Sequence, residues 1–241
     1  MTGGDDVLRV GAAFSDPPFH STGGGEHAGL DVDLIEAIGS RLACAVEFIA
    51  YQGRDFNGIF DALDSGEFDC VTSGTTVTGS RALKASFCDP YLISGQALAV
   101  DTGRLPGVHS VDDLEGLTIG IQHGNTSQPI ANRLVAEGKA ARVRVYGYGS
   151  GRTVLRDLTT GRCDAFMKLA PVLTELVRPL PGVEVVQRGI TAEKIAIAVP
   201  TSDAALLARI NVAQAELERD GTLPSIRQRW TGSDRLDQTG S

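Results

Sequence analysis

Strand and helix patterns alternate along the first third of the chain, and this order constrains the fold more than any other feature of the sequence. Short apolar runs typical of buried strands occur at residues 7–10, 44–50 and 68–72. Apolar residues at helical spacing fill the stretches between them, at 30–42 and 56–63. A strand–helix–strand order predicts parallel pairing with right-handed crossovers. The first part of the chain is therefore predicted to form an open parallel sheet flanked by helices.

The same alternation restarts after residue 95, which predicts a second α/β unit. Strand patterns occur at 96–100, 117–122, 141–145, 164–167, 183–187 and 194–199, and helical patterns at 111–115, 128–137, 153–159, 171–177, 203–219 and 224–230. Two units fit these elements better than one sheet, because twisted open sheets rarely exceed about ten strands. Ligands of open parallel sheets bind beyond the carboxyl ends of the strands. A cleft between two such units is therefore the expected site.

Charge and hydropathy exclude several classes of partner. Lysine plus arginine number 22 against 30 acidic residues, which gives a formal net charge of −8. This balance excludes a nucleic-acid-binding role and disfavours an anionic membrane surface as partner. No apolar run is long enough for a transmembrane helix, and the polar first residues have no signal-peptide pattern. Location is left open by composition, because a cytosolic protein and one that has lost a targeting segment would look the same.

The cysteines are scattered. They stand at positions 44, 70, 88 and 163, without a Cys-x-x-Cys pair and without a histidine at ligand spacing. A zinc site is therefore not expected. Free thiols are favoured over a disulfide, which the spacing leaves open.

Eight short motifs, each occurring once, follow one another along the chain. They are Leu8–Gly11, Pro17–Phe19, Gly29–Leu34, Phe60–Asp69, Ser73–Thr78 with Arg81, Phe87–Tyr91, Ile119–Gly124, and Asp220–Leu223 followed by Trp230. Through these residues the chain resembles the amino-acid-type substrate-binding proteins of ABC importers over almost its whole length. Each motif is weakly specific alone, and their order and spacing carry the resemblance.

The resemblance implies a two-lobed α/β fold of the periplasmic-binding-protein type, in which each lobe is a mostly parallel sheet flanked by helices. It implies lobe 1 at 1–94 plus 196–241, lobe 2 at 99–191, and hinge segments at 94–99 and 191–196. Residues 233–241 are polar and are expected to form a disordered tail. A periplasmic or extracellular location follows, with the signal segment absent from this sequence and a lipid anchor left open.

Arg81 matches the arginine that binds the ligand carboxylate in this family. A guanidinium offers two parallel N–H donors that fit a carboxylate. Ser73 and Thr76 are expected to add hydroxyl donors, and Gly74 to let the backbone approach the ligand. Without the motif, a surface arginine near a helix start would be the simpler interpretation.

Residues before the predicted helix of the second lobe match the family's second contact with the ligand. Asn125, Thr126 and Ser127 precede this helix, whose free N–H groups favour an anion; a plain N-cap is the alternative. Phe56 matches a position where the family stacks a side chain on the ligand. Phe14 is expected to form another wall of the site or to belong to the core.

The sequence departs from the family where an amino acid's ammonium group is usually bound. Leu169 stands at the position of the usual aspartate, and Ala13 replaces a second acidic residue. Lys168 is expected to bind a second anionic or carbonyl group; a solvated lysine, or one paired with Glu193, is the alternative. Asp16 is a candidate partner of Lys168 or an alternative ammonium site. A buried, unpaired ammonium is costly. We therefore expect a carboxylate ligand such as a keto, hydroxy, dicarboxylic or aromatic acid.

The sequence favours the first of three functions, and the apolar Val172 argues against the second. The first is a monomeric transport receptor that takes a small carboxylate to an ABC permease and needs no catalytic residue, metal or cofactor. The second is an enzyme that resembles the cyclohexadienyl dehydratases, which would need a carboxylic acid near Val172. The third is the sensor domain of a membrane receptor.

Overall fold

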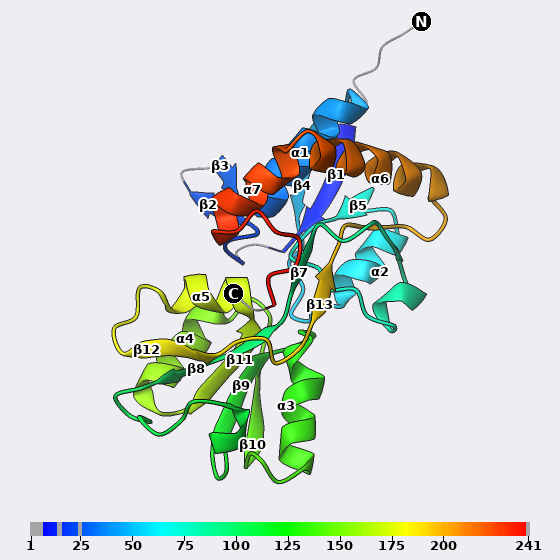
Figure 1. Cartoon of the computed structure of the whole chain (residues 1–241). Coiled ribbons are helices and arrows are strands. Elements are labelled where there is room, and N and C mark those ends of the chain that lie inside the picture. Colours follow the sequence, from blue (N-terminus) through cyan, green and yellow to red (C-terminus); the bar gives the residue numbers. More distant parts are fainter. Residues whose placement is uncertain (1–6, 14–15, 24–25, 240–241) are drawn as a thin grey trace, which may run out of the picture. The chain divides into compact units, whose positions relative to one another are not determined.

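Two structural units share the chain, and each is built on its own five-stranded sheet (Figure 1). The computed structural model describes residues 7–13, 16–23 and 26–239. Unit 1 comprises Met1–Gln52, Asn57–Ile93 and Lys194–Gln238, and unit 2 comprises Gly53–Phe56, Ser94–Glu193 and Thr239–Ser241. The chain thus passes between the units several times.

Unit 1 contains the first parallel sheet predicted from the sequence. Its elements are β1 (Val7–Ala12), β2 (Ser21–Gly23), β3 (Glu26–Ala28), α1 (Leu30–Leu42), β4 (Ala45–Ala50), α2 (Gly58–Asp64), β5 (Cys70–Val71), a 3₁₀ turn (Arg81–Leu83), β6 (Ser86–Phe87), β7 (Leu92–Ser94), β13 (Glu193–Ile195), β14 (Ala198–Val199), α6 (Ala204–Arg219) and α7 (Thr222–Thr231). The strand order is β4-β1-β5-β14-β6. β1 runs parallel to β4 and β5, whereas β14 is antiparallel to β5 and β6. Strands β7 and β13 straddle the unit boundary and pair as a small separate sheet.

Unit 2 repeats this plan. Its elements are β8 (Gln96–Asp101), a 3₁₀ turn (Val111–Asp113), β9 (Thr118–Gln122), α3 (Ser127–Ala136), β10 (Arg142–Tyr146), α4 (Gly151–Thr160), β11 (Ala165–Leu169), α5 (Ala170–Val177) and β12 (Val183–Gln187). The strand order is β10-β9-β11-β8-β12, and β9, β10 and β11 run parallel. β8 is antiparallel to both of its neighbours. Each sheet therefore has one reversed strand, and the predicted mostly parallel two-lobed α/β fold is confirmed.

Side chains of β8 show how helices come to cover both faces of the sheet in unit 2. Successive residues of a strand point to opposite faces. Leu98 and Val100 pack in the cluster that includes α3. Their neighbours Ala97 and Ala99 pack on the other face, with residues of α4 and α5. A continuous apolar run in the sequence thus becomes a strand buried on both sides.

The two units differ in detail from the predicted lobes. Residues 53–56, expected in the first lobe, belong to unit 2. The backbone N–H of Phe56 donates to the carbonyl of His123, and that of Tyr148 donates to the carbonyl of Arg54. The exact lobe boundaries stay a prediction.

The cysteines are free thiols. Cys70 lies in β5, and Cys88 and Cys163 are also buried, while Cys44 is half-buried. Burial raises the pKa of the Cys88 thiol to about 12 and that of Cys163 to about 11. Buried thiols of this kind behave as small apolar side chains.

Among the described residues, no helix is both long and apolar enough to span a membrane.

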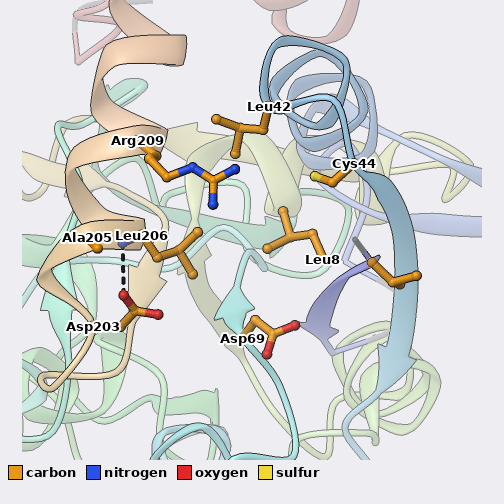
Figure 2. A pocket seen from close by; sticks show the side chains of 9 residues that line it. Leu8, Leu42, Cys44, Asp69, Asp203, Ala205, Leu206 and Arg209 are labelled. Atoms are coloured by element: carbon orange, nitrogen blue, oxygen red, sulfur yellow. Dashed lines mark hydrogen bonds between the residues drawn. The ribbon is translucent and has the colours of Figure 1, made fainter. Parts of the chain in front are cut away.

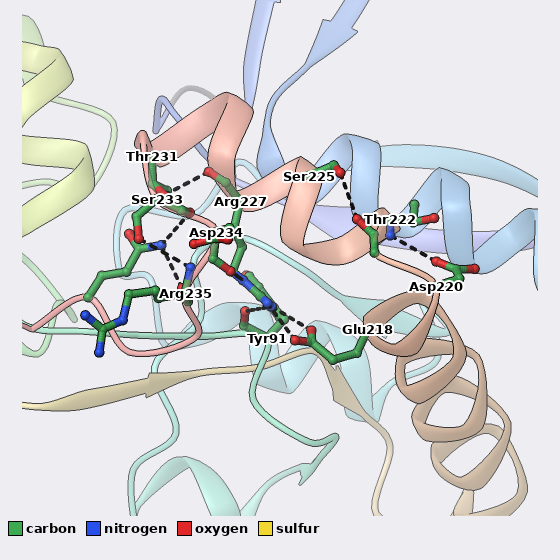
Figure 3. A network of polar contacts seen from close by, with 12 residues as sticks. Tyr91, Glu218, Asp220, Thr222, Ser225, Arg227, Thr231, Ser233, Asp234 and Arg235 are labelled. Atoms are coloured by element: carbon green, nitrogen blue, oxygen red, sulfur yellow. Dashed lines mark hydrogen bonds and ion pairs between the residues drawn. The ribbon is translucent and has the colours of Figure 1, made fainter.

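The buried side chain of Arg227 links the segment after α7 to the rest of unit 1 (Figure 3). The side chain of Arg227, on α7, is only 2% exposed and forms two hydrogen bonds with Glu218 near the end of α6, at 2.7 and 2.9 Å. It also donates to the carbonyls of Tyr91 and Asp234. A guanidinium is costly to bury unless its donors are used, and here four acceptors from three segments use them.

The segment after α7 differs from the expected disordered tail. The backbone N–H of Ile93 donates to the carbonyl of Leu236 at 2.7 Å, and that of Gln238 donates to the carbonyl of Ile93 at 2.8 Å. Polar composition alone suggested disorder, whereas these backbone hydrogen bonds are independent of side-chain type. Residues 240–241 lie outside the described part of the chain.

We expect Arg227→Ala to lower the free energy of unfolding by about 3 kcal/mol, because the buried carbonyls and Glu218 lose their donor. Arg229→Ala is the matched control on the same helix, since Arg229 is 70% exposed and pairs with Asp33 on the surface. Its loss should stay below about 1 kcal/mol. Urea unfolding measures both values, and equal losses would contradict this account.

Candidate ligand-binding residues

Arg81 lies in unit 1 at the start of the 3₁₀ turn and is 5% exposed. Its Nε donates to Oδ1 of Asn57 at 3.1 Å, and its Nη1 donates to the carbonyl of Thr76 at 2.8 Å. The guanidinium carbon lies 5.5 Å from the centre of the Phe60 ring. These contacts fix the plane of the guanidinium, which makes it a pre-oriented donor for a planar anion. The surface-arginine alternative is therefore wrong.

The loop before Arg81 is held by a buried carboxylate that sequence reasoning missed. Asp31, in the first turn of α1, accepts a hydrogen bond from the backbone N–H of Gly74 at 2.7 Å and one from the Tyr91 hydroxyl at 2.6 Å. Asp31 is fully buried, and this burial raises its pKa to about 6 against the opposing effect of these hydrogen bonds. The carboxylate thus joins α1, the loop and the segment before β7.

Two residues of this loop that were predicted to contact the ligand also have contacts within the protein. The Gly74 N–H donates to Asp31, and its role at a ligand stays a prediction. A glycine is required because φ is +55° and a Cβ would lie 2.8 Å from the Phe19 ring. The Ser73 hydroxyl accepts from the backbone N–H of Ala13 at 3.1 Å and contacts its carbonyl at 3.4 Å. Both residues therefore hold the loop in place.

A polar network lies at the amino end of α3 in unit 2. The Thr126 hydroxyl donates to Oε2 of Glu193 at 2.8 Å and accepts from Nε2 of Gln96 at 3.0 Å. Gln96 also donates to Oε1 of Glu193 at 3.0 Å. The Thr126 side chain does not form a capping hydrogen bond to α3. Because its hydroxyl hydrogen is used by Glu193, Thr126 has only its backbone N–H to offer an anion.

Neighbouring side chains at this helix end carry buried polar atoms that find no partner in the described part of the chain. Ser127 is fully buried, and its Oγ has no hydrogen-bond partner among the described residues. The same holds within the described chain for Nδ2 of Asn125. Buried polar atoms are rarely left unsatisfied in native proteins. Together with the free N–H groups of α3, these atoms form an arrangement suited to an anion.

Lys168 and Phe56 also belong to unit 2. The Lys168 side chain is 3% exposed, and its Nζ donates to Oε1 of Gln122 at 2.6 Å. Nζ also lies 5.5 Å from the centre of the Tyr148 ring. The rings of Phe56 and Tyr148 lie 5.1 Å apart. The alternative of a solvated Lys168 is therefore wrong.

The remaining predicted positions are less informative. Phe14 lies outside the described residues. The carbonyl of Asp16 accepts hydrogen bonds from the backbone N–H groups of Phe19 and His20. Its pairing with Lys168 stays a prediction. Leu169, at the usual aspartate position, is buried at the end of β11.

Gln96, Gln122 and Tyr148 were not predicted. Gln122 ends β9, and Tyr148 follows the end of β10. Gln96 is the first residue of β8, which is antiparallel to β11, and it pairs with Leu169, the last residue of β11. All three therefore lie at the edge where the parallel strands end. The rule that ligands bind at this edge would have indicated them, had the direction of β8 been known.

A pocket of about 310 Å³ in unit 1 carries none of the predicted residues (Figure 2). It is lined by Val7, Leu8, Leu42, Cys44, Asp69, Asp203, Ala205, Leu206 and Arg209. It lies at the amino ends of β1 and β4, the opposite end of the strands from the one that binds ligands in open sheets. Asp203 in this pocket accepts from the backbone N–H of Leu206, which is the N-cap contact of α6. We therefore do not place the ligand in this pocket.

Comparison with known proteins gives consistent matches over nearly the whole chain. The sequence signature of the bacterial extracellular solute-binding proteins, family 3, matches residues 8–233. The L-cystine-binding protein TcyJ of Escherichia coli is 28% identical over 230 residues, which cover 95% of this chain and 84% of TcyJ. A solved ancestral arginine-binding protein bound to arginine has a TM-score of 0.85 and 34% identity, and the match covers 94% of this chain and 98% of that one. The ancestral amino acid-binding protein AncCDT-1, described as a precursor of cyclohexadienyl dehydratase, has a TM-score of 0.83 and 30% identity, with 93% and 95% covered.

We expect Asp31→Asn to change how stability depends on pH. The folded-state pKa of Asp31, about 6, lies above its ordinary value of 3.8, so the folded protein binds this proton more tightly than the unfolded chain. Wild-type protein should therefore lose about 3 kcal/mol from this group as the pH rises from about 4 to about 6, and no more above that. The asparagine variant lacks this loss.

Urea unfolding of both proteins from pH 4 to 7 tests this expectation. Only the difference between the two curves is informative, because burial lowers the pKa of His20 to about 4 and acts in the opposite direction. The free energy of unfolding of Asp31→Asn, relative to that of the wild type, should increase as the pH rises. Parallel curves would contradict a raised pKa at Asp31.

Proposed function

We propose that this chain, which belongs to the bacterial extracellular solute-binding proteins of family 3, is a receptor. It binds a small amino-acid-type ligand and delivers it to an ABC importer. Its site of action would be periplasmic or extracellular, free or lipid-anchored. The observation that carries the proposal is the buried, oriented guanidinium of Arg81 on a chain that matches the family from residue 8 to 233.

In this proposal the ligand carboxylate binds Arg81 from unit 1. Within unit 2, the free N–H groups of α3 with Asn125 and Ser127 are a second candidate anion-binding group. The chain crosses between the units beside β7 and β13. No covalent step is required.

The printed names of the relatives favour an amino acid over a plain organic acid. TcyJ is named for L-cystine, and an ancestral neighbour was solved with arginine. The organic acid expected from Leu169 has no such support. We therefore propose a ligand with an amino acid's carboxylate, and treat simple organic acids as competitors to be tested.

A dehydratase activity is the second candidate, because AncCDT-1 is described as a precursor of cyclohexadienyl dehydratase. Such chemistry would need an acid near Val172, which is instead a buried apolar residue of α5. Turnover of prephenate or arogenate by the purified protein would favour the enzyme. Binding without turnover would favour the receptor.

The twenty L-amino acids, L-cystine and their matching organic acids form a panel of candidate ligands. We expect at least one of them to raise the melting temperature of the protein. Arg81→Lys keeps the charge but loses the fork of donors. It should weaken that ligand by about 30- to 150-fold, or about 2–3 kcal/mol, in isothermal titration.

The surface substitution Arg229→Lys is the matched control and should leave the affinity unchanged, since Arg229 is largely exposed on α7. An unchanged affinity in Arg81→Lys would contradict the assigned role of Arg81. A panel in which no compound raises the melting temperature would contradict the receptor function itself.

A further inference from the structure

We propose that the edge strand β10 of unit 2 is an interaction surface, and that its partner is an extended protein segment in which acidic and apolar residues alternate. This segment would join the sheet as a further strand, with its acidic side chains against the arginines of β10. The inference goes beyond the proposed function, because it concerns a surface of unit 2 that needs no small ligand.

Basic residues are concentrated in one stretch of a chain that is acidic as a whole. Residues 138–163 contain six basic residues and one acidic residue, whereas the formal net charge of the chain is −8. This stretch includes β10 and α4. Five of the six basic residues are arginines, and a guanidinium matches the geometry of a carboxylate. A local excess of positive charge favours an acidic partner.

The one acidic residue of this stretch is already used within the protein. Asp157 is 2% exposed, and its Oδ2 accepts from the Tyr146 hydroxyl at 3.0 Å and pairs with Nη2 of Arg144 at 3.2 Å. Its Oδ1 lies 3.9 Å from Nε of Arg156. Two guanidinium groups thus share one carboxylate, which neutralises the charge of only one of them.

The arginines of this stretch reach the solvent. The side chain of Arg144 is 45% exposed and that of Arg156 is 64% exposed. Arg142 is exposed as well. Its Nε donates to Oγ1 of Thr118 at 2.9 Å, and its two terminal nitrogens have no partner among the described residues. These nitrogens are therefore available to a carboxylate that approaches from outside.

β10 also offers an open backbone edge. In the described part of the chain it is the outermost strand of its sheet, whose order is β10-β9-β11-β8-β12, and it pairs with β9 alone. The outer side of an edge strand presents unpaired N–H and C=O groups. An extended peptide can add to such an edge through main-chain hydrogen bonds.

The side chains of β10 alternate, and this alternation defines the pattern of the partner. Arg142 and Arg144 point to the same face as Tyr146, which packs with residues of α4. Val143 and Val145 point to the other face, where Val143 packs in the cluster that includes α3 and Val145 is 49% exposed. Directly opposed residues of neighbouring strands share a face. Acidic residues opposite the arginines and apolar residues opposite the valines would match both faces.

The same arginines disfavour a second copy of β10 as the partner. Edge-to-edge pairing of two copies would bring arginine side chains against arginine side chains, and like charges opposed on neighbouring strands are destabilising. Charged residues on an edge strand commonly prevent such pairing. The strand therefore selects an acidic segment over a copy of itself.

Fluorescence anisotropy with a designed peptide, in low-salt buffer and without any small ligand, tests the inference. The probe is a labelled peptide with blocked ends and the sequence Gly-Glu-Val-Glu-Val-Glu-Gly. Wild-type protein should bind it at least about tenfold more tightly than the peptide with lysine in place of every glutamate. N-methylation of the central glutamate and the following valine removes one N–H from each edge of the peptide. It should weaken binding by about tenfold as well, because strand pairing needs these donors.

Arg142→Glu is the protein variant that tests the surface. Its side chain is exposed and contacts only the Thr118 hydroxyl, so the reversed charge should weaken peptide binding at least about fivefold. Arg133→Glu is the matched control, with the same change of charge in the same unit. Arg133 is 64% exposed on α3, where it pairs with Glu137. Its reversal should weaken binding less than about twofold, because salt screens distant surface charges.

Several results would overturn the inference. Absence of peptide binding, or equal binding of the glutamate and lysine peptides, would exclude an acidic partner. Equal binding of the N-methylated peptide would leave a cationic patch without strand pairing. Self-association of the protein that Arg142→Glu abolishes would place a second copy on β10 instead. If Arg142→Glu fails to fold, the peptide comparisons on wild-type protein still decide. The proposed function is tested separately through Arg81 and stands or falls independently of these results.

Discussion

The carboxylate of Asp31 is buried in unit 1, and the arrangement of the predicted anion site depends on it. Its two oxygens accept from the backbone of Gly74 and the hydroxyl of Tyr91, so one charge fixes α1, the loop and the segment before β7 together. Burial raises the pKa of this group to about 6, which means that the ionised carboxylate lowers the free energy of unfolding at neutral pH. The benefit is a rigid loop beside Arg81. A pre-oriented guanidinium loses less entropy when it binds an anion.

Opposite charges are buried in the two units, and each has a different use. Asp31 in unit 1 is enclosed by donors of its own unit and supports the loop before Arg81. Lys168 in unit 2 lies near the end of β11 and donates to Gln122 at the end of β9. The formal net charge of −8 is a sum over the whole chain, so it does not report on single buried charges such as these.

The sequence predicted the elements well where periodicity and order decide, and less well where long-range contacts decide. The helix over 30–42 and the parallel pairing of β1 with β4 and β5 were predicted correctly, because spacing and connection rules fix them. The β2–β3 hairpin was missed because its strands are three residues each. The roles of Ser73 and Gly74 depend on Ala13 and Asp31, which are 60 and 43 residues away along the chain. No local pattern reports such partners.

A crystal structure of the protein with its tightest-binding ligand tests the central claim most directly. The account predicts that the ligand carboxylate lies within about 3 Å of the Arg81 guanidinium nitrogens. It also predicts that the Asp31–Gly74 hydrogen bond persists in the complex. A ligand whose carboxylate lies away from Arg81 would contradict the account.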